Sequence, residues 1–412
     1  MLEVTSDKNP IIPGRGICDP HIKVFNDVVY LYASHDASPI ATDYTMNHWE
    51  VWSSQDLKTW RQEARIDPAD FYTGPTNEAW AVDVASKNGK YYLYFSQGNR
   101  STGVAVSDTP VGPWTDALGR ALLDGSLTGG RDYDPTVFVD DDGQAYIIVG
   151  GPEWAYPGQG GYFIAKLGED MVSLAETPRR VEVDHPGDDK ASLNRMGDHY
   201  YLTYASHVAV SDNVYGPYRY LGNTGGSLDH GCYFAWRGQS YHAFTIFDPS
   251  LWFRASGLCY VHQRSDLMLQ IDPLVMEYGA HRYKAEWNMI GAHWYSRKVG
   301  GTKRESFRGG FVVSFGYSGL LEFDGIEGAA TADTLVLCGA TSGSALSYVQ
   351  ISIDGVPWEP LELPDTGGTQ GPRFFVMPIP ITGVCQNLTL AVMPGADAEV
   401  DIDWWSLRSS TG

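Results

Sequence analysis

The sequence lacks the features of a membrane or nucleic-acid-binding protein. No apolar run approaches the ~18 residues of a membrane-spanning helix, and residues 1–4 lack the basic and apolar regions of a signal peptide. Acidic residues outnumber basic ones by 50 to 29, and the net charge of −21 repels phosphate backbones. We therefore expect no membrane and no nucleic acid as partner. We expect a cytoplasmic protein if the sequence is complete, and a secreted one if a signal peptide has been removed.

Cysteine is scarce, and several familiar catalytic motifs are missing. The five cysteines form no Cys-x-x-Cys pair, which indicates neither a disulfide scaffold nor a thiolate zinc site, although Cys338 and Cys385 could pair in a secreted protein. The sequence contains no Gly-x-Ser-x-Gly elbow, phosphate-binding Gly-x-x-x-x-Gly-Lys loop, His-Glu-x-x-His helix or dinucleotide-binding Gly-x-Gly-x-x-Gly turn. These absences argue against the corresponding hydrolases, nucleotide-binding proteins and metalloproteases.

Tyrosine, tryptophan and glycine are abundant, with 25, 13 and 46 copies, as in proteins built from many short strands and tight turns. One element occurs five times: a strand, a turn with Gly, Asn or Asp, and a second strand that opens with tyrosine. The five tyrosines, 40 to 62 residues apart, are Tyr30, Tyr92, Tyr146, Tyr201 and Tyr241. Units of this length with four short strands predict an all-β fold, a five-bladed β-propeller.

The repeat ends near residue 290, and the remaining chain has a different pattern. Alternating strands without the repeat tyrosine occur at residues 311–315, 348–353 and 388–392. Such alternation predicts a β-sandwich that is packed on one face of each sheet. We expect a propeller over residues 1–290 and a sandwich over residues 291–412.

Each propeller repeat carries an ionisable residue nine to twelve positions before its tyrosine. These residues are Asp19, Asp83, Asp134, Asp189 and His230. The first strand of a blade lies innermost, so we expect these side chains to meet in the central channel. Neighbouring carboxylates raise one another's pKa, which lets one stay protonated while another is ionised, as glycoside hydrolysis requires. The alternative is that these aspartates only begin strands and cap turns.

The motifs around these residues resemble those of glycoside hydrolase family 43, five-bladed propellers that cleave arabinofuranosyl and xylosyl linkages with inversion. The matching segments are residues 9–12, Cys18-Asp19-Pro20-His21, residues 78–84, residues 133–143, Asp229-His230-Gly231 and Phe253-Arg254. The resemblance implies that Asp19 is the general base and that Asp134 raises the pKa of the acid and orients it. It also implies that His230 binds a central calcium ion or its water shell.

Blade four departs from the family pattern, which has glutamate as the general acid. This chain reads Asp188-Asp189-Lys190-Ala191-Ser192-Leu193-Asn194, and alignment places Asp189 at the acid position. Loss of a well-placed general acid costs ~10²–10⁴ in rate. Three possibilities stay open: Asp189 is the acid, Asp188 supplies the proton, or the site mainly binds sugar.

The site residues and the resemblance together predict a function. We predict an inverting, exo-acting hydrolase that releases terminal α-L-arabinofuranose from arabinoxylan or arabinan of plant cell walls, with Trp80, Asp83 and Arg254 binding substrate. Trp154 and Tyr156 could also stack on sugar faces. The alternatives are a β-xylosidase and a carbohydrate-binding protein with a weakened site. Residues 401–407 resemble the closing strand of a family 6 carbohydrate-binding module.

Overall fold

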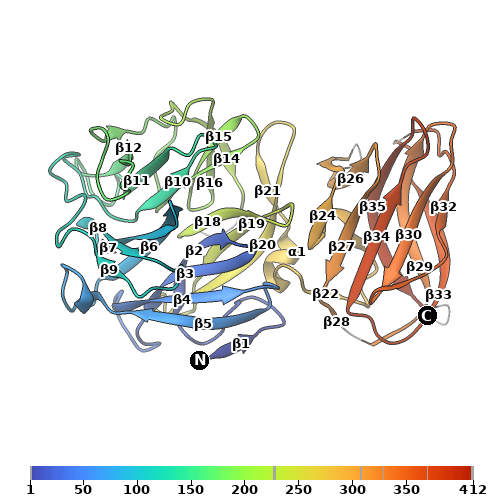
Figure 1. The fold of residues 1–412 in the computed structure, drawn as a ribbon, viewed down its shortest axis with the longest axis horizontal. Helices are drawn as coiled ribbons and strands as arrows, with labels where there is room; N and C mark the ends of the chain where they lie inside the picture. Colours follow the sequence, from blue (N-terminus) through green and yellow to red (C-terminus); the bar gives the residue numbers. More distant parts are fainter. Residues whose placement is uncertain (1, 226–228, 307–308, 328, 369, 410–412) are drawn as a thin grey trace. The chain divides into compact units, whose positions relative to one another are not determined.

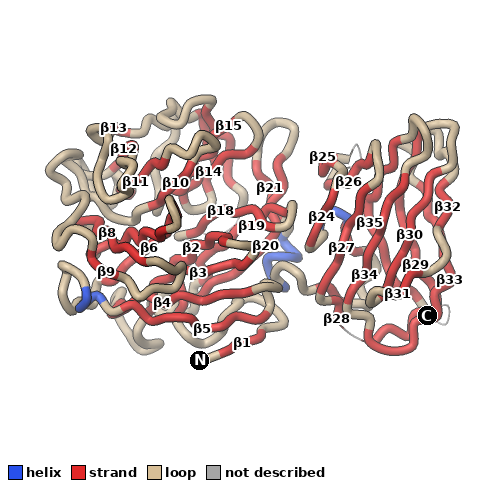
Figure 2. Tube along the Cα trace, in the orientation of Figure 1, coloured by secondary structure: helices blue, strands red, loops and turns tan. Residues whose placement is uncertain are grey.

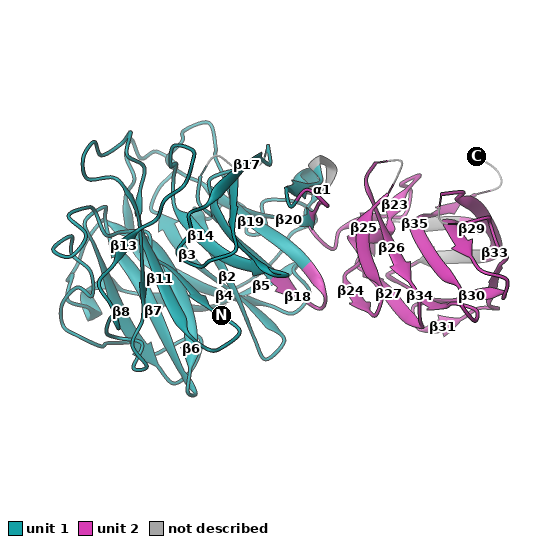
Figure 3. Cartoon of the chain, turned by 90° about the horizontal axis from the view of Figure 1, so that it is seen from above, with its two compact units in different colours: residues 1–234, 240–262, 267–279 teal, residues 235–239, 263–266, 280–412 magenta. Residues whose placement is uncertain are grey.

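The computed structural model describes residues 2–225, 229–306, 309–327, 329–368 and 370–409, and it is built almost entirely of strands (Figures 1 and 2). The chain divides into two compact units (Figure 3): residues 1–234, 240–262 and 267–279 form unit 1, and residues 235–239, 263–266 and 280–412 form unit 2. Among the described residues, no helix has the length and apolar character needed to cross a membrane. The functional division at residue 290 stays a prediction.

The propeller consists of five antiparallel sheets, each with four strands in chain order, and blade one has an additional outer strand, β1 (Glu3–Thr5). Blade one contains β2 (Ile17–Phe25), β3 (Val28–Asp36), β4 (Met46–Ser54) and β5 (Thr59–Ile66). Blade two contains β6 (Ala79–Lys87), β7 (Lys90–Gln97), β8 (Ser101–Ser107) and β9 (Thr115–Asp116). Blade three contains β10 (Thr136–Val139), β11 (Ala145–Gly151), β12 (Gly161–Lys166) and β13 (Arg179–Arg180).

Blade four contains β14 (Ala191–Met196), β15 (His199–Tyr204), β16 (His207–Ser211) and β17 (Arg219–Asn223). Blade five contains β18 (Gly231–Trp236), β19 (Gln239–Ile246), β20 (Ala255–Gln263) and β21 (Leu269–Ile271). A 3-10 turn, η1 (Pro68–Asp70), follows blade one, and helix α1 (Pro273–Tyr278) follows blade five. The predicted five-bladed propeller is confirmed.

The turn residues of the sequence repeat explain the first hairpin of each blade. Asn26 and Asp27 join β2 to β3 with φ of 51° and 63°, and Asn88 and Gly89 join β6 to β7 with φ of 52° and 75°. Two-residue hairpins favour positive φ at both central positions, because that backbone twist matches the twist of the strands. Asn, Asp and Gly tolerate this conformation, so the turn sequence determines where each blade folds back.

The apolar core of the propeller lies between neighbouring blades. Tyr32 of blade one packs in one cluster with Leu93 of blade two, and Tyr94 of blade two shares a cluster with Ile147 of blade three. Successive residues of the same strand, Leu93 and Tyr94, therefore face opposite neighbouring blades, as the two-residue period of a strand requires. This packing presents the starts of the innermost strands to the centre of the propeller.

The predicted β-sandwich is also confirmed, within unit 2. One sheet has the order β25 (Thr302–Glu305), β26 (Phe311–Phe315), β35 (Glu399–Arg408), β29 (Ala329–Ser342) and β33 (Arg373–Val384), with β23 (Ile290–Gly291) on β35. The other has the order β24 (Arg297–Val299), β27 (Gly319–Asp324), β34 (Asn387–Met393), β30 (Ser347–Ile353) and β31 (Val356–Pro357), with β32 (Leu361–Leu363) on β30. A parallel pair, β22 (Tyr283–Lys284) with β28 (Ile326–Glu327), and the turn η2 (Ala292–Trp294) complete the unit.

The five cysteines are all buried and free, so Cys338 and Cys385 form no disulfide. This agrees with the absence of a disulfide pattern in the sequence.

Candidate active site

A cavity of about 300 Å³ opens where the five blades meet, and every blade contributes to its lining. The lining residues are Asp19, Tyr44, Met46, Trp80, Tyr133, Asp134, Pro152, Trp154, Ala155, Tyr156, Asp189, Asp229, His230 and Arg254. A larger cavity of about 690 Å³ borders blades three and four, with Tyr162, Tyr218 and Arg219 in its lining. None of the predicted site residues lines this second cavity, so the smaller one is the candidate active site.

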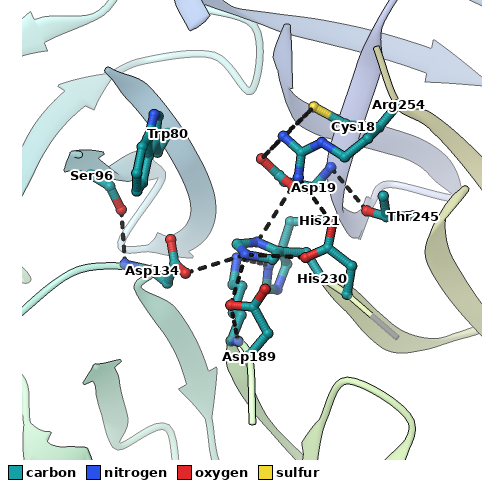
Figure 4. A network of polar contacts seen from close by, with 12 residues as sticks. Cys18, Asp19, His21, Trp80, Ser96, Asp134, Asp189, His230, Thr245 and Arg254 are labelled. Atoms are coloured by element: carbon teal, nitrogen blue, oxygen red, sulfur yellow. Dashed lines mark hydrogen bonds and ion pairs between the residues drawn. The ribbon is translucent and has the colours of Figure 1, made fainter. Parts of the chain in front are cut away.

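His230 lies at the centre of a group of carboxylates (Figure 4). Its Nε2 is 3.2 Å from Asp189 Oδ1 and 3.3 Å from Asp134 Oδ2, and its Nδ1 is 3.6 Å from Asp19 Oδ1. The imidazole ring therefore separates Asp19 on one side from Asp134 and Asp189 on the other. Although burial opposes charge on His230, the surrounding carboxylates raise its pKa well above the usual value.

Arg254 neutralises the carboxylates on the Asp19 side of the ring. Its Nη1 donates to Asp19 Oδ1 at 2.7 Å and to Asp229 Oδ2 at 3.0 Å, and its Nη2 donates to Asp36 Oδ1 at 3.0 Å. All four side chains are buried. Because buried carboxylates are costly unless paired, this guanidinium allows three of them to lie close together, and two of these, Asp19 and Asp229, line the cavity.

The backbone holds two of the aspartates in an unusual conformation. Asp19 has φ of 50° and Asp134 has φ of 53°, in the left-handed region that residues other than glycine rarely adopt. Side-chain hydroxyls brace both positions, since Thr245 Oγ1 accepts from Asp19 N at 3.3 Å and Ser96 Oγ accepts from Asp134 N at 2.8 Å. Such conformations cluster at functional sites, where the surrounding structure stabilises them.

The pKa values of Asp134 and Asp189 shift in opposite directions. Burial raises the pKa of Asp134 to about 7, and the nearby charges of Asp189 and Asp19 act in the same direction. Burial alone would also raise the pKa of Asp189, but the charge and hydrogen bond of His230 lower it well below the usual range. His230 thus favours the carboxylate form of Asp189, whereas burial favours the protonated form of Asp134.

Among the predicted substrate-binding residues, Asp83 does not reach the cavity. Its side chain is fully buried, with Oδ1 3.2 Å from His21 Nε2 and 3.2 Å from Lys23 Nζ. Its Oδ2 accepts from the backbone N–H of Val137 at 2.6 Å. The prediction that Asp83 binds substrate is therefore contradicted by geometry: Asp83 lies within β6, opposite Tyr94 of β7, and its side chain contacts residues of blades one and three instead of the cavity.

The aromatic side chains predicted to stack on sugars do line the cavity. Trp154 is 69% exposed, whereas Tyr156 is fixed by Asn99, whose Nδ2 donates to the phenol oxygen at 2.8 Å. The guanidinium carbon of Arg131 also lies over the Tyr156 ring, 4.5 Å from the ring centroid. Trp80 is partly buried beside the cavity. The cavity therefore combines fixed rings with one exposed ring at its edge.

Asp188, the alternative proton donor, points away from the cavity lining. Its Oδ2 lies 3.5 Å from His207 Nε2, and its Oδ1 accepts from the backbone N–H of Asp189 at 2.9 Å. Asp188 therefore orients the segment that carries Asp189 and does not face the carboxylates around His230.

Two groups of residues at this site could hold a cation, Asp19 with Asp229 and His230, and Asp134 with Asp189 and His230. Calcium takes six to eight oxygen ligands. Arg254 already donates to Asp19 and Asp229, whereas the buried Asp134 Oδ1 has no hydrogen-bond partner among the described residues. The site fits calcium only on the Asp134 side, with water completing the coordination.

Asp36, Asp229, Tyr44 and Tyr133 belong to the site but were not predicted from sequence. Asp229 comes directly before His230, and Tyr133 comes directly before Asp134. Their position next to predicted site residues could have indicated that they belong to the site. Asp36 lies at the end of a second strand with no counterpart in the other repeats, and only the fold brings it to Arg254.

Comparisons with known proteins agree with this geometry. The sequence profile of glycosyl hydrolases family 43 matches residues 7–207. The chain is 29% identical over 272 residues to an arabinoxylan arabinofuranohydrolase of Paenibacillus polymyxa, a match that covers 54% of this chain and 42% of that protein. It is 31% identical over 275 residues to xylosidase/arabinosidase 43A of Humicola insolens, a match that covers 52% of this chain and 81% of that protein.

A solved structure of a family 43 arabinoxylan arabinofuranohydrolase from Bacillus subtilis in complex with cellotetraose has the same fold. It superposes with a TM-score of 0.56 at 22% identity and covers 97% of both chains. The chain spans less than half of the Paenibacillus protein but most of the Humicola one. Together with the profile match, the similarity to the Humicola protein shows that the chain belongs to glycosyl hydrolases family 43.

Proposed function

We propose that the protein is an inverting, exo-acting hydrolase that releases terminal α-L-arabinofuranose from arabinoxylan or arabinan. The observation that carries this proposal is the pair of carboxyl groups, Asp19 and Asp189, on opposite sides of the His230 ring in one cavity. Inverting enzymes keep their two carboxyl groups ~6.5–9.5 Å apart to leave room for a water molecule. A cavity of about 300 Å³ suits one terminal sugar better than the middle of a polymer.

In the proposed reaction, Asp19 accepts a proton from water as the water oxygen attacks the anomeric carbon. The glycosidic C–O bond breaks on the opposite face, and Asp189 donates a proton to the leaving oxygen. Arg254 holds Asp19 in place through the 2.7 Å hydrogen bond and sets a positive charge beside it. The new C–O bond forms on the face opposite the broken one, so the sugar is released with inverted configuration.

The acid must gain a proton before it can act, because His230 favours the carboxylate form of Asp189. The Asp189 side chain is 33% exposed, so a sugar in the cavity removes water from it. Burial raises the pKa of a carboxyl group. We propose that substrate binding in this way brings the pKa of Asp189 toward that of Asp134, which carries the proton nearby.

Relatives support the substrate class, since one is named for arabinoxylan and another for both xylose and arabinose. The second candidate is therefore a β-xylosidase that uses the same carboxylates. Hydrolysis of aryl α-L-arabinofuranoside and aryl β-D-xyloside, followed by ¹H NMR of the first anomer released, tests both the sugar and the inversion. Retention of configuration would contradict the roles of Asp19 and Asp189.

A carbohydrate-binding protein with a weakened site is the outcome if neither glycoside is cleaved but sugars bind. Activity that appears only in Asp189→Glu would then identify the shortened acid as the cause. A sugar-binding role for the sandwich of residues 291–412 likewise stays a proposal. Measuring the affinity of the full chain for xylan, with and without substitutions on the surface of the sandwich, tests it.

We also propose that calcium binds in the central channel beside His230 through its water shell, since direct coordination by Asp189 would prevent that residue from carrying the proton it donates. Bound calcium would supply positive charge to the carboxylates around the cavity. We expect exhaustive chelation to lower both the melting temperature and the activity. Unchanged values after chelation would show that His230 and Arg254 alone balance the acidic charge.

A further inference from the structure

Blade one contains a second cluster of potential metal ligands, separate from the cavity lining. His35, His48 and Glu50 each place one ligand atom within 4.8 Å of the others. His48 and Glu50 are buried, at 4% and 3% exposure. None of the three lines the candidate active site, so the proposed reaction gives them no role.

The strand pairing explains why these residues meet. His48 and Glu50 are two positions apart on β4, so their side chains leave the same face of the sheet. On the paired strand β3, Ala33 pairs with Glu50 and Ser34 with Trp49, so the same register sets His35 opposite His48 and on this face. The two imidazole rings stack with their centroids 4.1 Å apart.

Hydrogen bonds from outside the cluster orient the ligands. His48 Nδ1 lies 2.6 Å from Asn47 Oδ1, which selects the tautomer with a proton on Nδ1 and leaves the Nε2 lone pair for another partner. Trp52 Nε1 donates to Glu50 Oε2 at 2.8 Å, which leaves Oε1 facing His48. Metal-binding histidines and carboxylates are characteristically held by such outer partners.

Two features of the cluster are explained poorly by hydrogen bonding alone. In neutral His48 with its proton on Nδ1, the Nε2 lone pair faces Glu50 Oε1 at 3.2 Å and the two acceptors repel each other, so the contact needs either a second proton on the ring or a cation. His35 Nδ1 is buried and has no hydrogen-bond partner among the described residues. A cation between these atoms would satisfy both.

We propose that His35, His48 and Glu50 form a zinc site in blade one, with water as the fourth ligand. Two imidazoles and one carboxylate are a ligand set that Zn²⁺ prefers. In tetrahedral zinc with bonds of 2.0–2.1 Å, neighbouring ligand atoms are about 3.3 Å apart. The 3.2 Å separation of His48 Nε2 and Glu50 Oε1 already matches this geometry.

Two arginines limit the affinity of the site. Arg65 on β5 is the cross-strand neighbour of Glu50 on β4. The Arg15 guanidinium lies 5.7 Å from the centroid of the Trp52 ring. Their positive charge opposes a divalent cation, so Arg65→Gln should tighten zinc binding whereas loss of a ligand weakens it. A merely structural role for these residues predicts no such opposite effects.

The test is titration of the full chain with Zn²⁺ against a chromophoric chelator, and with Co²⁺ followed by the visible absorption of tetrahedral cobalt. We expect one equivalent that His35→Gln and Glu50→Gln each weaken by at least about 100-fold, since loss of even an outer partner costs ~10–100-fold. Zinc should also raise the melting temperature of the wild type but not of Glu50→Gln. His199→Gln is the matched control, because His199 is part of an exposed ion pair with Asp212 on blade four.

If a ligand variant fails to fold, Asn47→Ala takes its place, because it removes only the outer hydrogen bond and should weaken zinc by ~10–100-fold. Zinc bound at the candidate active site would persist in all of these variants. The proposal is overturned if the wild type binds no zinc, or if wild type, His35→Gln and Asn47→Ala bind the same amount with the same affinity.

Discussion

Replacing Asp189 with asparagine removes the proposed proton donor while keeping the side-chain volume. The variant keeps an amide oxygen or nitrogen 3.2 Å from His230, so the fold of the site should survive. Loss of a general acid costs ~10²–10⁴ in rate, or about 2.7–5.4 kcal/mol of transition-state free energy. This loss applies only where the leaving oxygen needs a proton.

The assay therefore compares two leaving groups. With an arabinoxylan oligosaccharide, whose leaving alcohol is a poor one, we expect Asp189→Asn to lose ~10²–10⁴ in kcat/KM. With a dinitrophenyl arabinofuranoside, whose phenolate leaves without protonation, the loss should be much smaller. Asp188→Asn is the control: the asparagine oxygen can still accept from the backbone N–H of Asp189, and the side chain faces His207, so this variant should retain most activity on both substrates.

The competing donor is Asp134, whose pKa of about 7 makes it the more protonated carboxyl group. In our proposal, Asp134→Asn lowers the rate on both substrates similarly, because it alters the charge around Asp189. If the dependence on the leaving group appears in Asp134→Asn and not in Asp189→Asn, Asp134 is the acid and our reasoning is refuted.

Three further perturbations test other parts of the structure. Burial lowers the pKa of His242 to about 4, so below pH ~6.5 the unfolded state binds a proton that the folded state does not, and the His242 contribution should lower the free energy of unfolding by about 3 kcal/mol from pH 7 to pH 4. His242→Phe, which can keep the stack on Tyr233, should flatten the dependence of the urea-derived free energy of unfolding on pH between pH 7 and pH 4. An identical slope in the variant would contradict this prediction. Arg254→Met leaves the buried Asp19, Asp36 and Asp229 without their cation. We therefore expect denaturant unfolding to show a loss of about 3–5 kcal/mol in the free energy of unfolding. Unfolding at the wild-type denaturant midpoint would mean that the carboxylates take up protons instead. Trp154→Ala removes an exposed ring at the cavity edge. The loss of stacking should raise KM for oligosaccharides about 2–10-fold, and the melting temperature should not change. An unchanged KM would show that Trp154 does not contact the substrate.

The fold and most of the site could be predicted because they depend on local sequence. The turn residues Asn26-Asp27 and Asn88-Gly89 specify hairpins wherever they occur, and their repetition indicates the five blades. Asp19, Asp134, Asp189 and His230 stand at equivalent places in their repeats, so the symmetry of the propeller brings them together. No knowledge of distances was needed for these predictions.

The tertiary structure alone decided where Asp83 points and what surrounds the other carboxylates. Asp83 stands nine residues before its repeat tyrosine, against eleven or twelve for its counterparts, and the folded chain places it within β6 with its side chain against His21 and Lys23. The pairing of Asp36 and Asp229 with Arg254 joins residues far apart in the chain. The opposite pKa shifts of Asp134 and Asp189 follow from burial and from their contacts with His230. Electrostatic interaction depends on distance through space and on exclusion of water, and the order of residues along the chain contains neither.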